Sequence, residues 1–547
     1  MLPGDSAVLR KARGAFFTPE PVARFLVRWA VRTDVDAVLE PSCGEAVFLH
    51  ELGVRGHRGP LVGVELHAGS AQEAQRSLRR RGIAATIHDG DFFEYRDLGG
   101  YDAVVGNPPY IRYQDFSGEA RAAARSAARG GGVRLTNLAS SWAAFTVHSA
   151  RHLKVGGRLA LVLPAELLTV NYAAEVRRFL LEHFTSVGLV LFAERVFPDV
   201  QEEVVLLLAE GYTGPGGTGT DHVTVRMAKD ADDLANPAIS RRWAPPHAAA
   251  KWSGGLLSAA GERIYDEAVT SGVFGTLSTW GETTLGMVTG NNRFFTLSPS
   301  TVAELGLADS DVVELSPPGS RHLRQLSLTS ARWKSLGAQG AATYLFRPPG
   351  DPSAAARRYI ESGESLDVHT AYKCRVRSPW WRVPYLRPAD LFLTYMNADT
   401  PRLVTNRVGA HHLNSVHGVY LRPGVKGLGK GLLPIASLNS LTLLGAETVG
   451  RAYGGGILKL EPREADRWPM PPPEVVGRAA GSLRSVRPAV AAALAHGELL
   501  EAVAMVDDVL LKGVLGLGDQ QLGVLRHDHA ELTARRSARG RRAHRGD

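Results

Sequence analysis

Four consecutive residues, Asn107-Pro108-Pro109-Tyr110, combine a side-chain amide, two prolines and an aromatic ring. The prolines restrict the backbone, so the Asn107 side-chain oxygen and the Pro108 carbonyl are held in fixed directions. Two preorganised acceptors suit an exocyclic amine, because accepting both N–H protons stabilises the positive charge that develops as its nitrogen attacks. The Tyr110 ring offers a surface on which an extruded base could stack. The loop therefore predicts chemistry on an amino group.

Acidic residues follow apolar runs upstream of this loop, where strands of an α/β fold would end. Glu40 lies in Leu39-Glu40-Pro41-Ser42-Cys43-Gly44, Glu65 precedes Leu66, and Asp91 precedes Phe92. In such folds ligands sit outside the carboxyl ends of the strands, and an acid after the second strand binds ribose hydroxyls. Asp91 would accept the amine of an adenine while Phe92 covers the ring. No G-x-G-x-x-G cradle is present in this turn, which argues against a dinucleotide.

Each of these acids also has a purely structural interpretation. The Glu40 turn could be an ordinary connection between a strand and a helix, and Glu65 a surface acid at a strand end. Asp91-Phe92 could be a capped turn followed by a core phenylalanine. The Asn107 loop, behind the other three features at the end of a fourth strand, favours one common site.

The elements that must position these residues alternate over the first 210 residues, as in a doubly wound α/β domain. Thr18-Pro19-Glu20 predicts a helix start with Thr18 as the capping hydroxyl. The predicted strands are Ala37–Leu39, Leu61–Val64, Ala84–Ile87, Asp102–Val105, Leu159–Leu163, Val187–Phe192 and Val204–Leu208. The predicted helices include Ser70–Arg81, Leu138–Leu153 and Tyr172–His183. Seven strands are expected, and the short spacing of the last two suggests an antiparallel strand at the sheet's edge.

Breaks in composition predict the domain organisation. The Gly-rich stretch Gly211–Thr220 ends the first domain, which we place at residues 1–220. Residues 221–475 are rich in short strands, Gly, Pro and Trp and predict a second, mixed domain, and Trp468–Glu474 is a further breaker. Residues 476–530 predict a helical segment. Residues 531–547 are a basic tail, either disordered or an auxiliary phosphate-binding arm.

Composition limits the possible classes of protein. The 547 residues carry a net charge of +8, which suggests an acidic partner. Two cysteines alone cannot form a disulfide framework or a zinc site, and no metal is expected. No apolar run reaches the roughly 18 residues of a membrane span, and the N-terminus lacks the apolar core of a signal peptide. We therefore expect a cytoplasmic protein without a membrane partner.

Together these motifs resemble the amino-methylating DNA methyltransferases, in particular the gamma class of restriction–modification systems. Phe16-Phe17-Thr18-Pro19 is similar to the N-terminal cofactor motif of that class, Glu40 to Phe48 to its first motif, and Glu65-Leu66 to its second. Asp91-Phe92 is similar to the third motif and Asn107 to Tyr110 to the catalytic one. Val196-Phe197-Pro198 resembles the motif whose aromatic ring faces the base opposite the tyrosine.

The resemblance implies a class I S-adenosylmethionine-dependent methyltransferase fold with a mixed α+β target recognition domain and C-terminal helices. It implies S-adenosyl-L-methionine as the methyl donor, N6 of a flipped adenine in double-stranded DNA as the target, and direct transfer without a covalent intermediate or a metal. The implied catalytic residues are Asn107, Pro108, Pro109, Tyr110 and Phe197. The implied cofactor residues are Phe17, Thr18, Pro19, Glu40, Pro41, Cys43, Gly44, Glu65, Leu66, Asp91, Phe92 and Asn107.

Further segments resemble the recognition domain of a subgroup of this class. They share Arg, Lys or Asn interleaved with aromatic rings, or glycines that allow close backbone approach. They are Gly286–Phe295, Tyr372–Arg377, Pro379–Trp381, Tyr453–Gly456 and Lys459–Glu464. The Trp380-Trp381 pair could equally be core packing.

Several alternatives stay open. N4 of cytosine presents a similar amine. Asn-Pro-Pro-Tyr also occurs in methyltransferases of release-factor glutamine and in some RNA methylases, but the roughly 330 residues after the first domain favour DNA. A catalytically silent nucleic-acid-binding protein is opposed by the intact motif set. About 15 residues precede the Phe16 motif, too few for a nuclease domain, so a nuclease or defence-system partner would be a separate chain. The oligomeric state is undetermined, and a monomer is compatible with these features.

Overall fold

The structure is a computed structural model that describes residues 18–112, 114–197, 203–236, 240–453 and 456–541. The described chain divides into two compact units, one containing residues up to Leu257 together with the chain from Ser537, the other Ser258–Arg536. The predicted boundary at residue 220 is therefore wrong. Two further strands after Thr220 pair with the first sheet and extend the first unit to Leu257.

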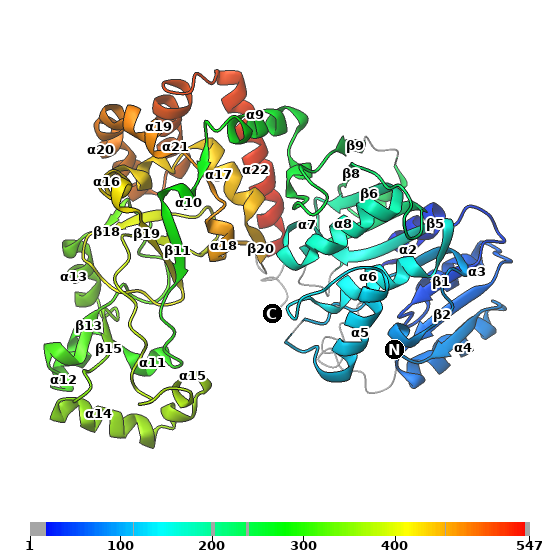
Figure 1. The fold of residues 1–547 in the computed structure, drawn as a ribbon, viewed down its shortest axis with the longest axis horizontal. Coiled ribbons are helices and arrows are strands. Elements are labelled where there is room, and N and C mark those ends of the chain that lie inside the picture. Colours follow the sequence, from blue (N-terminus) through cyan, green and yellow to red (C-terminus); the bar gives the residue numbers. More distant parts are fainter. Residues whose placement is uncertain (1–17, 113, 198–202, 237–239, 454–455, 542–547) are drawn as a thin grey trace. The chain divides into compact units, whose positions relative to one another are not determined.

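The first unit is built on a sheet of nine strands among the described residues, in the order β3-β2-β1-β4-β5-β7-β6-β8-β9. Its strands are β1 Val38–Pro41, β2 Leu61–Glu65, β3 Thr86–Asp89, β4 Tyr101–Gly106, β5 Leu153–Pro164, β6 Phe184–Phe192, β7 Val204–Tyr212, β8 Val223–Ala228 and β9 Ser240–Trp243. Its helices are α2 Glu20–Ala30, α3 Val47–Val54, α4 Ala68–Arg80, α5 Gly118–Gly130, α6 Ser141–Arg151, α7 Glu166–Thr169 and α8 Ala174–His183. The expected doubly wound α/β fold is therefore confirmed (Figure 1).

The predicted antiparallel strand is present but does not lie at the edge. β7 is antiparallel to both β5 and β6 and lies between them. The other side of β6 pairs in parallel with β8, so β8 and β9 form the edge instead. The sequence spacing predicted the direction of β7. Its position within the sheet depends on pairing with β5, which is distant in the sequence.

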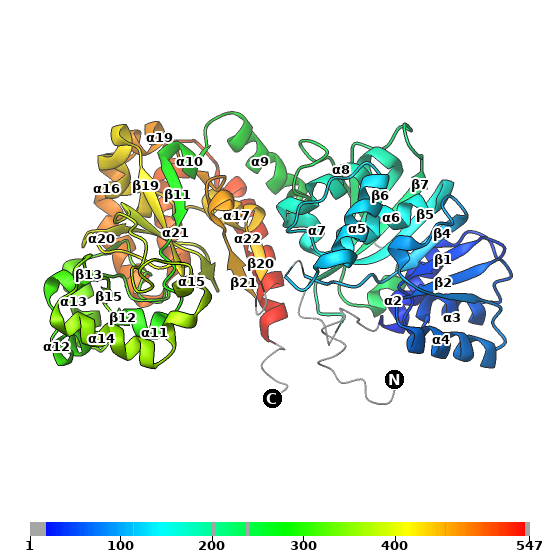
Figure 2. The same ribbon diagram turned by 60° about the horizontal axis from the view of Figure 1, so that its bottom comes forward.

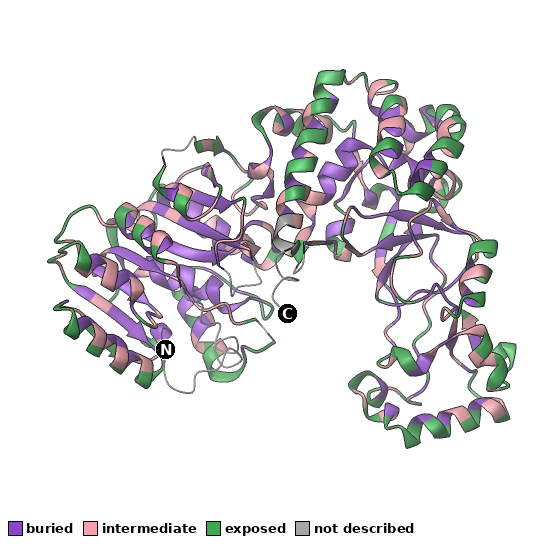
Figure 3. Ribbon diagram, turned by 180° about the vertical axis from the view of Figure 1, so that it is seen from behind, coloured by how far each residue is buried: buried purple, intermediate pink, exposed green. Residues whose placement is uncertain are grey.

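Helices cover both faces of this sheet, as a doubly wound fold requires (Figure 2). Alternate strand residues point to opposite faces, so each strand contributes to two cores. On one face Val38, Val105 and Val162 pack with α2, α3 and α4. On the other face Leu39, Val104 and Leu161 pack with α5, α6 and α8. Figure 3 shows these strands largely buried.

The second unit combines small sheets with helices. Its largest sheet has the order β11-β19-β16-β18-β14, and two three-stranded sheets are β12-β15-β13 and β17-β21-β20. Its strands are β10 Gly275–Thr276, β11 Gly281–Leu285, β12 Thr296–Leu297, β13 Val312–Glu314, β14 Ser327–Leu328, β15 Tyr344–Phe346, β16 Leu391–Thr394, β17 Met396–Asn397, β18 Leu403–Asn406, β19 Val416–Leu421, β20 Arg451–Tyr453, β21 Ile457–Lys459 and β22 Pro469–Met470. Its helices up to residue 465 are α9 Ala259–Thr270, α10 Leu277–Trp280, α11 Asn292–Phe295, α12 Pro299–Glu304, α13 Ser330–Ala338, α14 Ala354–Ser365, α15 Tyr372–Arg375, α16 Lys426–Ala436, α17 Ser440–Val449 and α18 Pro462–Ala465.

The C-terminal helices belong to the core of the second unit rather than to a separate segment. They are α19 Pro473–Arg478, α20 Ala480–His496, α21 Leu499–Asp507 and α22 Asp519–Arg541, the last of which belongs to this unit as far as Arg536. Leu483, Val490 and Val506 pack in one cluster with the large sheet's Leu391 and Val419. Helices α19, α20 and α21 therefore form one hydrophobic core together with the large sheet.

The predicted disordered tail is wrong for residues 531–541, which continue α22. Arg536 is 3% exposed, and its guanidinium pairs with the Glu447 carboxylate at 2.8 Å. It also donates to the carbonyls of Ala398 and Asp399 at 3.1 and 2.8 Å. A buried cation with this many partners fixes the helix, which the basic composition alone could not indicate.

Among the described residues no single helix is long and apolar enough to cross a membrane. One pair bent by 90°, Pro423–Ala436 with Ser440–Val449, passes by length and composition only.

Candidate active site

The turn after β1 is fastened to the first turn of α3 by Glu40. This side chain is 2% exposed, and its carboxylate accepts from the Leu49 amide at 3.1 Å. Burial raises the pKa of the Glu40 carboxyl well above its usual range, although the backbone amides of Phe48 and Leu49 oppose the shift. Glu40 therefore shapes the turn from within.

Three residues of this turn have left-handed backbone conformations. Ser42 has φ 49°, Gly44 φ 53° and Ala46 φ 56°. Such angles are costly for serine and alanine and concentrate at functional sites. A side chain added at Gly44 would meet no atom within 4 Å, so the backbone there borders open space. The turn is a strained segment that a ligand could approach closely.

Glu65, at the end of β2, joins this turn to the next strand. Its carboxylate accepts from the amides of Gly44 at 2.9 Å and His67 at 3.0 Å. Cys43 adds a backbone bond to the Val64 carbonyl at 2.9 Å. The next residue, Leu66, is 61% exposed and presents an apolar surface beside the acid. The structure thus brings together the predicted residues of the first two motifs.

The loop Asn107–Tyr110, whose predicted role is catalytic, follows β4 and lies against the same turn. A Cβ added at Gly106 would be 3.3 Å from both the Cδ and the carbonyl oxygen of Pro41. The next residue, Asn107, donates through Nδ2 to the Thr18 hydroxyl at 3.2 Å. The predicted role of Thr18 as a helix cap is therefore wrong, because α2 begins without a side-chain cap and the hydroxyl holds Asn107 instead. Phe17 lies outside the described residues.

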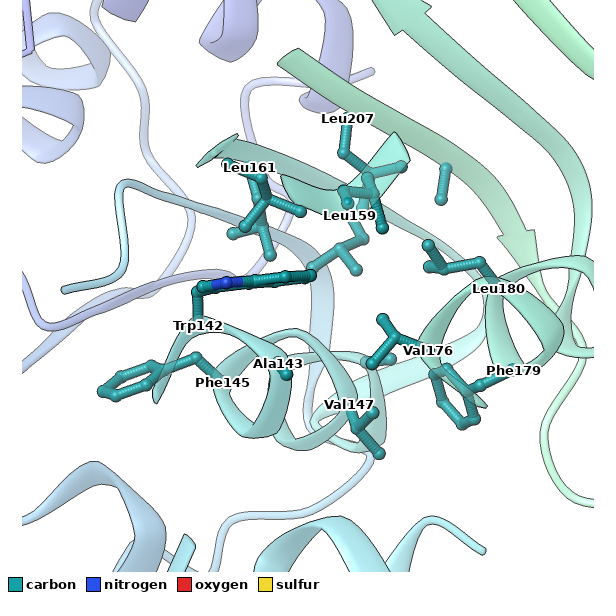
Figure 4. Packing of buried hydrophobic residues seen from close by; sticks show 14 of the residues in the cluster. Trp142, Ala143, Phe145, Val147, Leu159, Leu161, Val176, Phe179, Leu180 and Leu207 are labelled. Carbon is teal, nitrogen blue, oxygen red and sulfur yellow. The ribbon is translucent and has the colours of Figure 1, made fainter. Parts of the chain in front are cut away.

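The loop is also held from the other side by Ser141, a residue that the sequence motifs did not indicate. Its hydroxyl donates to the Pro109 carbonyl and accepts from the Ile111 amide at 2.9 Å. The Ser141 amide donates in return to the Ile111 carbonyl at 3.0 Å. Ser141 begins α6, and the adjacent Trp142 is fully buried against Leu159 and Leu161 (Figure 4). The only sequence signal was a serine pair before an apolar helix.

Tyr110 and Phe197 belong to the same packed cluster. The Tyr110 hydroxyl donates to the Val162 carbonyl of β5 at 3.0 Å, and the side chain is partly buried. Phe197 is 4% exposed and lies in the cluster against which Tyr110 packs. Phe197 is thus a core residue, and its expected role opposite Tyr110 stays a prediction. Pro198 lies outside the described residues.

The Asp91-Phe92 pair takes the structural form of a capped turn. One oxygen of Asp91 accepts from the Phe93 amide at 2.9 Å and caps the short helix Phe92–Glu94. Phe92 is 3% exposed and stacks on Phe145 with ring centroids 5.4 Å apart. The expectation that Phe92 covers an adenine is therefore wrong, because its ring faces are in the core. The other Asp91 oxygen forms no hydrogen bond within the described chain.

A polar cluster at the end of β5 adjoins Ser141. Glu166 accepts on one oxygen from the Tyr172 hydroxyl at 2.5 Å and from the Trp142 indole at 3.3 Å. Burial raises the pKa of Tyr172 well above its usual range, followed by the effect of the Glu166 charge. This cluster fixes Trp142, and through it the start of α6.

Cys43 cannot readily supply a thiolate. The side chain is 5% exposed, and burial raises the pKa of its thiol well above the usual range, with the Glu40 and Glu65 charges adding to the rise. Within the part of the chain that the structure describes, no group of three or more His, Cys, Asp or Glu side chains is placed to hold a metal ion.

In the second unit, two of the segments expected in the recognition domain are fastened together. Arg377 donates to the carbonyls of Thr289, at 2.8 Å, and Val288. Cys374 is fully buried beside Gly290, whose φ is +91°. The Trp pair is mainly structural, since Trp381 is 8% exposed and Trp380 packs 5.6 Å from Phe294. Gly454 and Gly455 lie outside the described residues.

Two family models match this chain, one for each unit. The Eco57I restriction-modification methylase matches residues 65–197, which carry the Glu65, Asp91 and Asn107 motifs. The C-terminal domain of the type II methyltransferase M.Eco57I matches residues 249–511. The chain belongs to the M.Eco57I family of restriction–modification methylases. The second match begins near the boundary at Leu257 and includes α19, α20 and α21, part of the segment that was predicted to be separate.

Type II methyltransferases resemble this M.Eco57I-family methylase over most of its length. M.XamI of Xanthomonas campestris pv. amaranthicola is 27% identical and covers 84% of this chain and 85% of its own. M.AccI of Acinetobacter calcoaceticus is 21% identical and covers 84% of this chain and 86% of its own. The release factor glutamine methyltransferase of Geobacter sulfurreducens is 34% identical, over 15% of this chain and 28% of its own. The M.Eco57I-family methylase is accordingly a DNA methyltransferase with a C-terminal domain.

Proposed function

We propose that this methylase transfers the methyl group of S-adenosylmethionine to N6 of an adenine flipped out of duplex DNA. The observation that carries the proposal is the double anchoring of the Asn107 loop. Thr18 holds the Nδ2 end of the Asn107 amide, and Ser141 holds the carbonyl of Pro109. The loop is thereby preorganised before any substrate arrives, which is what stabilisation of a developing charge requires.

The chemistry of the turn after β1 and of its neighbours fits a nucleoside with a charged tail. Gly44 borders open space, Glu65 lies at the end of β2, and exposed Leu66 beside it offers an apolar face for a purine. Asp91 has one carboxylate oxygen to accept an exocyclic amine. S-adenosylmethionine, when bound, supplies an electrophilic methyl group. Thr18, Gly44, Glu65, Leu66 and Asp91 are the residues that we propose hold it.

Asn107 and Pro108 act on the amine of the target base. With Nδ2 of Asn107 engaged by Thr18, Oδ1 is the end of the amide that would accept one amine proton, and the Pro108 carbonyl would accept the other. Drawing both protons away localises the lone pair on nitrogen and stabilises the positive charge of the transition state. The buried Cys43 thiol has no part in this direct transfer.

Two alternatives keep this chemistry and change the substrate. N4 of a flipped cytosine would meet the same two acceptors. Release-factor glutamine or RNA would not require a second unit of the size of Ser258–Arg536. The similarity to M.XamI over 84% of the chain, against 15% for the glutamine methyltransferase, supports duplex DNA.

The experiment is modified-base sequencing of DNA from a host that expresses the chain. The comparison variants are Asn107→Ala and Asn236→Ala, the second an exposed asparagine of the first unit. We expect N6-methyladenine at one short motif with the native chain and with Asn236→Ala, and none with Asn107→Ala. N4-methylcytosine would establish the cytosine alternative. Absence of any modified base with the native chain would contradict the proposal that this chain acts alone on DNA.

A further inference from the structure

A stretch of the second unit carries positive charge without compensation. Residues 372–387, here the basic segment, contain five cations, Lys373, Arg375, Arg377, Arg382 and Arg387. No aspartate or glutamate occurs between Asp367 and Asp390. Lys373, Arg375, Arg382 and Arg387 are all exposed, and none of them forms an ion pair with a carboxylate of the described chain. Some exposed cations elsewhere in this unit do form such pairs, for example Arg357 with Asp351.

Aromatic rings are interleaved with these cations and are exposed with them. Tyr372 is 64% exposed and Tyr385 is 59% exposed. The Lys373 ammonium lies 5.5 Å from the Tyr372 ring centre, and the Arg387 guanidinium 4.5 Å from that of Tyr420. Exposed tyrosines beside unpaired cations are typical of a surface that binds a polyanion, because the rings can stack or donate hydrogen bonds as the charges are neutralised.

A further cation joins the segment from a neighbouring strand end. The Arg347 guanidinium lies 4.9 Å from the Tyr385 ring centre and donates to the Val383 carbonyl at 3.0 Å. Burial lowers the pKa of Arg347, and the positive charge of Arg382 lowers it further. The cations are therefore close enough to repel one another. An anion placed among them would relieve that repulsion.

The backbone of the segment is held in place by contacts that use other side chains. The Arg377 guanidinium donates to the carbonyls of Val288 and Thr289. Cys374, a residue of α15 (labelled in Figure 1), is fully buried. The Tyr420 hydroxyl donates to the Arg387 carbonyl at 2.6 Å. Because its backbone is already fixed, the segment loses little backbone entropy when it binds.

We infer that the basic segment binds the phosphate backbone of the DNA duplex through Lys373, Arg375 and Arg382, and this inference rests on the proposed function. Reading base edges requires side chains that are themselves held by hydrogen bonds or packing. Neither the Arg375 nor the Arg382 guanidinium forms a hydrogen bond within the described structure. Long, flexible cations of this kind are well suited to binding phosphates. The segment therefore contributes affinity and position rather than sequence choice.

The test compares two full-length triple variants that each remove three positive charges from exposed positions of the second unit. One is Lys373→Gln/Arg375→Gln/Arg382→Gln, and the control is Arg357→Gln/Arg484→Gln/Lys334→Gln, all at exposed residues. Fluorescence anisotropy on a 30-base-pair duplex containing the methylated motif gives Kd as a function of NaCl concentration. Methylation kinetics and modified-base sequencing give kcat, KM and the motif of the same proteins.

We expect the segment variant to weaken binding by more than tenfold and to flatten the slope of log Kd against log salt by about 2 to 3, since each neutralised phosphate contributes about 0.9. Its kcat at saturating DNA and its motif should match those of the native protein, and the control variant should bind as the native protein does. Unchanged Kd and slope in the segment variant would overturn the inference, and so would a changed motif, which would make these residues base readers. Failure of the native protein to methylate DNA would instead reject the proposed function, and the same binding series on a 30-base-pair duplex of arbitrary sequence would still test the segment.

Discussion

The side-chain amide of Asn107 donates to the hydroxyl of Thr18 at 3.2 Å, joining residues 89 positions apart. Thr18 precedes α2, and Asn107 follows β4, so the contact crosses from the start of the catalytic unit to its central loop. It links a residue of the expected cofactor motif with the expected catalytic residue. Binding of a cofactor against Thr18 would thus bear directly on the orientation of Asn107.

Replacing Thr18 by valine should slow the reaction. Valine keeps the shape of threonine but cannot accept from Asn107, and the loss of one such hydrogen bond costs about 1 kcal/mol, or roughly five- to tenfold in kcat. Thr18→Ser retains the hydroxyl and should stay within about twofold of the native rate. Steady-state methylation of duplex DNA measures both. A Thr18→Val enzyme as fast as the native one would show that this contact does not orient the catalytic amide.

Removing the Ser141 hydroxyl should loosen the catalytic loop. Ser141→Ala leaves the Ile111 amide and the Pro109 carbonyl without their partner in a buried site, at a cost of about 1–3 kcal/mol. We expect kcat to fall by roughly tenfold or more, while the Kd of S-adenosylmethionine, measured by calorimetry, changes little.

The matched control for Ser141 is Ser149→Ala on the same helix. Ser149 is fully buried too, but its hydroxyl makes no hydrogen bond within the described structure. Its removal should leave kcat unchanged and the thermal midpoint equal or higher. Equal kcat losses in Ser141→Ala and Ser149→Ala would point to general disturbance of α6 and against a specific hold on the loop.

Both cysteines should be unreactive in the folded protein. Burial raises the pKa of the Cys43 and Cys374 thiols, so little thiolate is present at pH 8. Iodoacetamide should leave the native chain unlabelled and should label two positions in urea, as mass spectrometry would show. Cys43→Ala should keep methylation activity within about threefold. Loss of all activity in Cys43→Ala, with the fold intact, would indicate a covalent role that direct transfer excludes.

Acid should destabilise the first unit through His148. This side chain is fully buried and donates to the Phe92 carbonyl at 3.0 Å, and burial lowers its pKa to about 3, with the charges of His152 and Arg151 adding to the shift. The unfolded chain binds the proton near pH 6.5 and the folded chain does not. Stability is therefore complete above pH 6.5 and falls as the pH decreases toward 3, by at most about 1.4 kcal/mol per pH unit.

His148→Gln removes the titration but keeps a donor for the Phe92 carbonyl. The drop in calorimetric Tm between pH 7.5 and pH 5.5 should be smaller in this variant than in the native chain. His496→Gln replaces an exposed histidine and serves as the control, with the native drop expected. An equal drop in all three proteins would mean that other groups set the acid sensitivity of this unit.

Much of the fold is encoded in local patterns. Val38–Pro41, Leu61–Glu65 and Tyr101–Gly106 were predicted to within a few residues, because each is a short apolar run bounded by turn residues. The parallel β1, β2 and β4 then bring the residues after them to one end of the sheet, since parallel strands share the direction of their carboxyl ends. The closeness of Glu65, Gly44 and Asn107 follows from that rule.

Long-range packing decided what local patterns could not. The sequence Asp91-Phe92 does not indicate whether the Phe92 ring covers a ligand or packs in the core. In the structure the ring stacks on Phe145 within the core. The position of β7 in the sheet depends on its pairing with β5. The basic C-terminal stretch is helical because Arg536 pairs with the buried Glu447.

By itself, the sequence determined which acceptors the proposed chemistry uses, since Asn107-Pro108-Pro109-Tyr110 fixes their types and order within four residues. Only the tertiary structure decided what holds them. Thr18 and Ser141 reach the loop from 89 and 32 positions away, and a hydroxyl at such a distance leaves no periodicity or spacing to read. The physical reason is that a side-chain hydrogen bond is specific to geometry, and that geometry exists only after both cores of the sheet have packed.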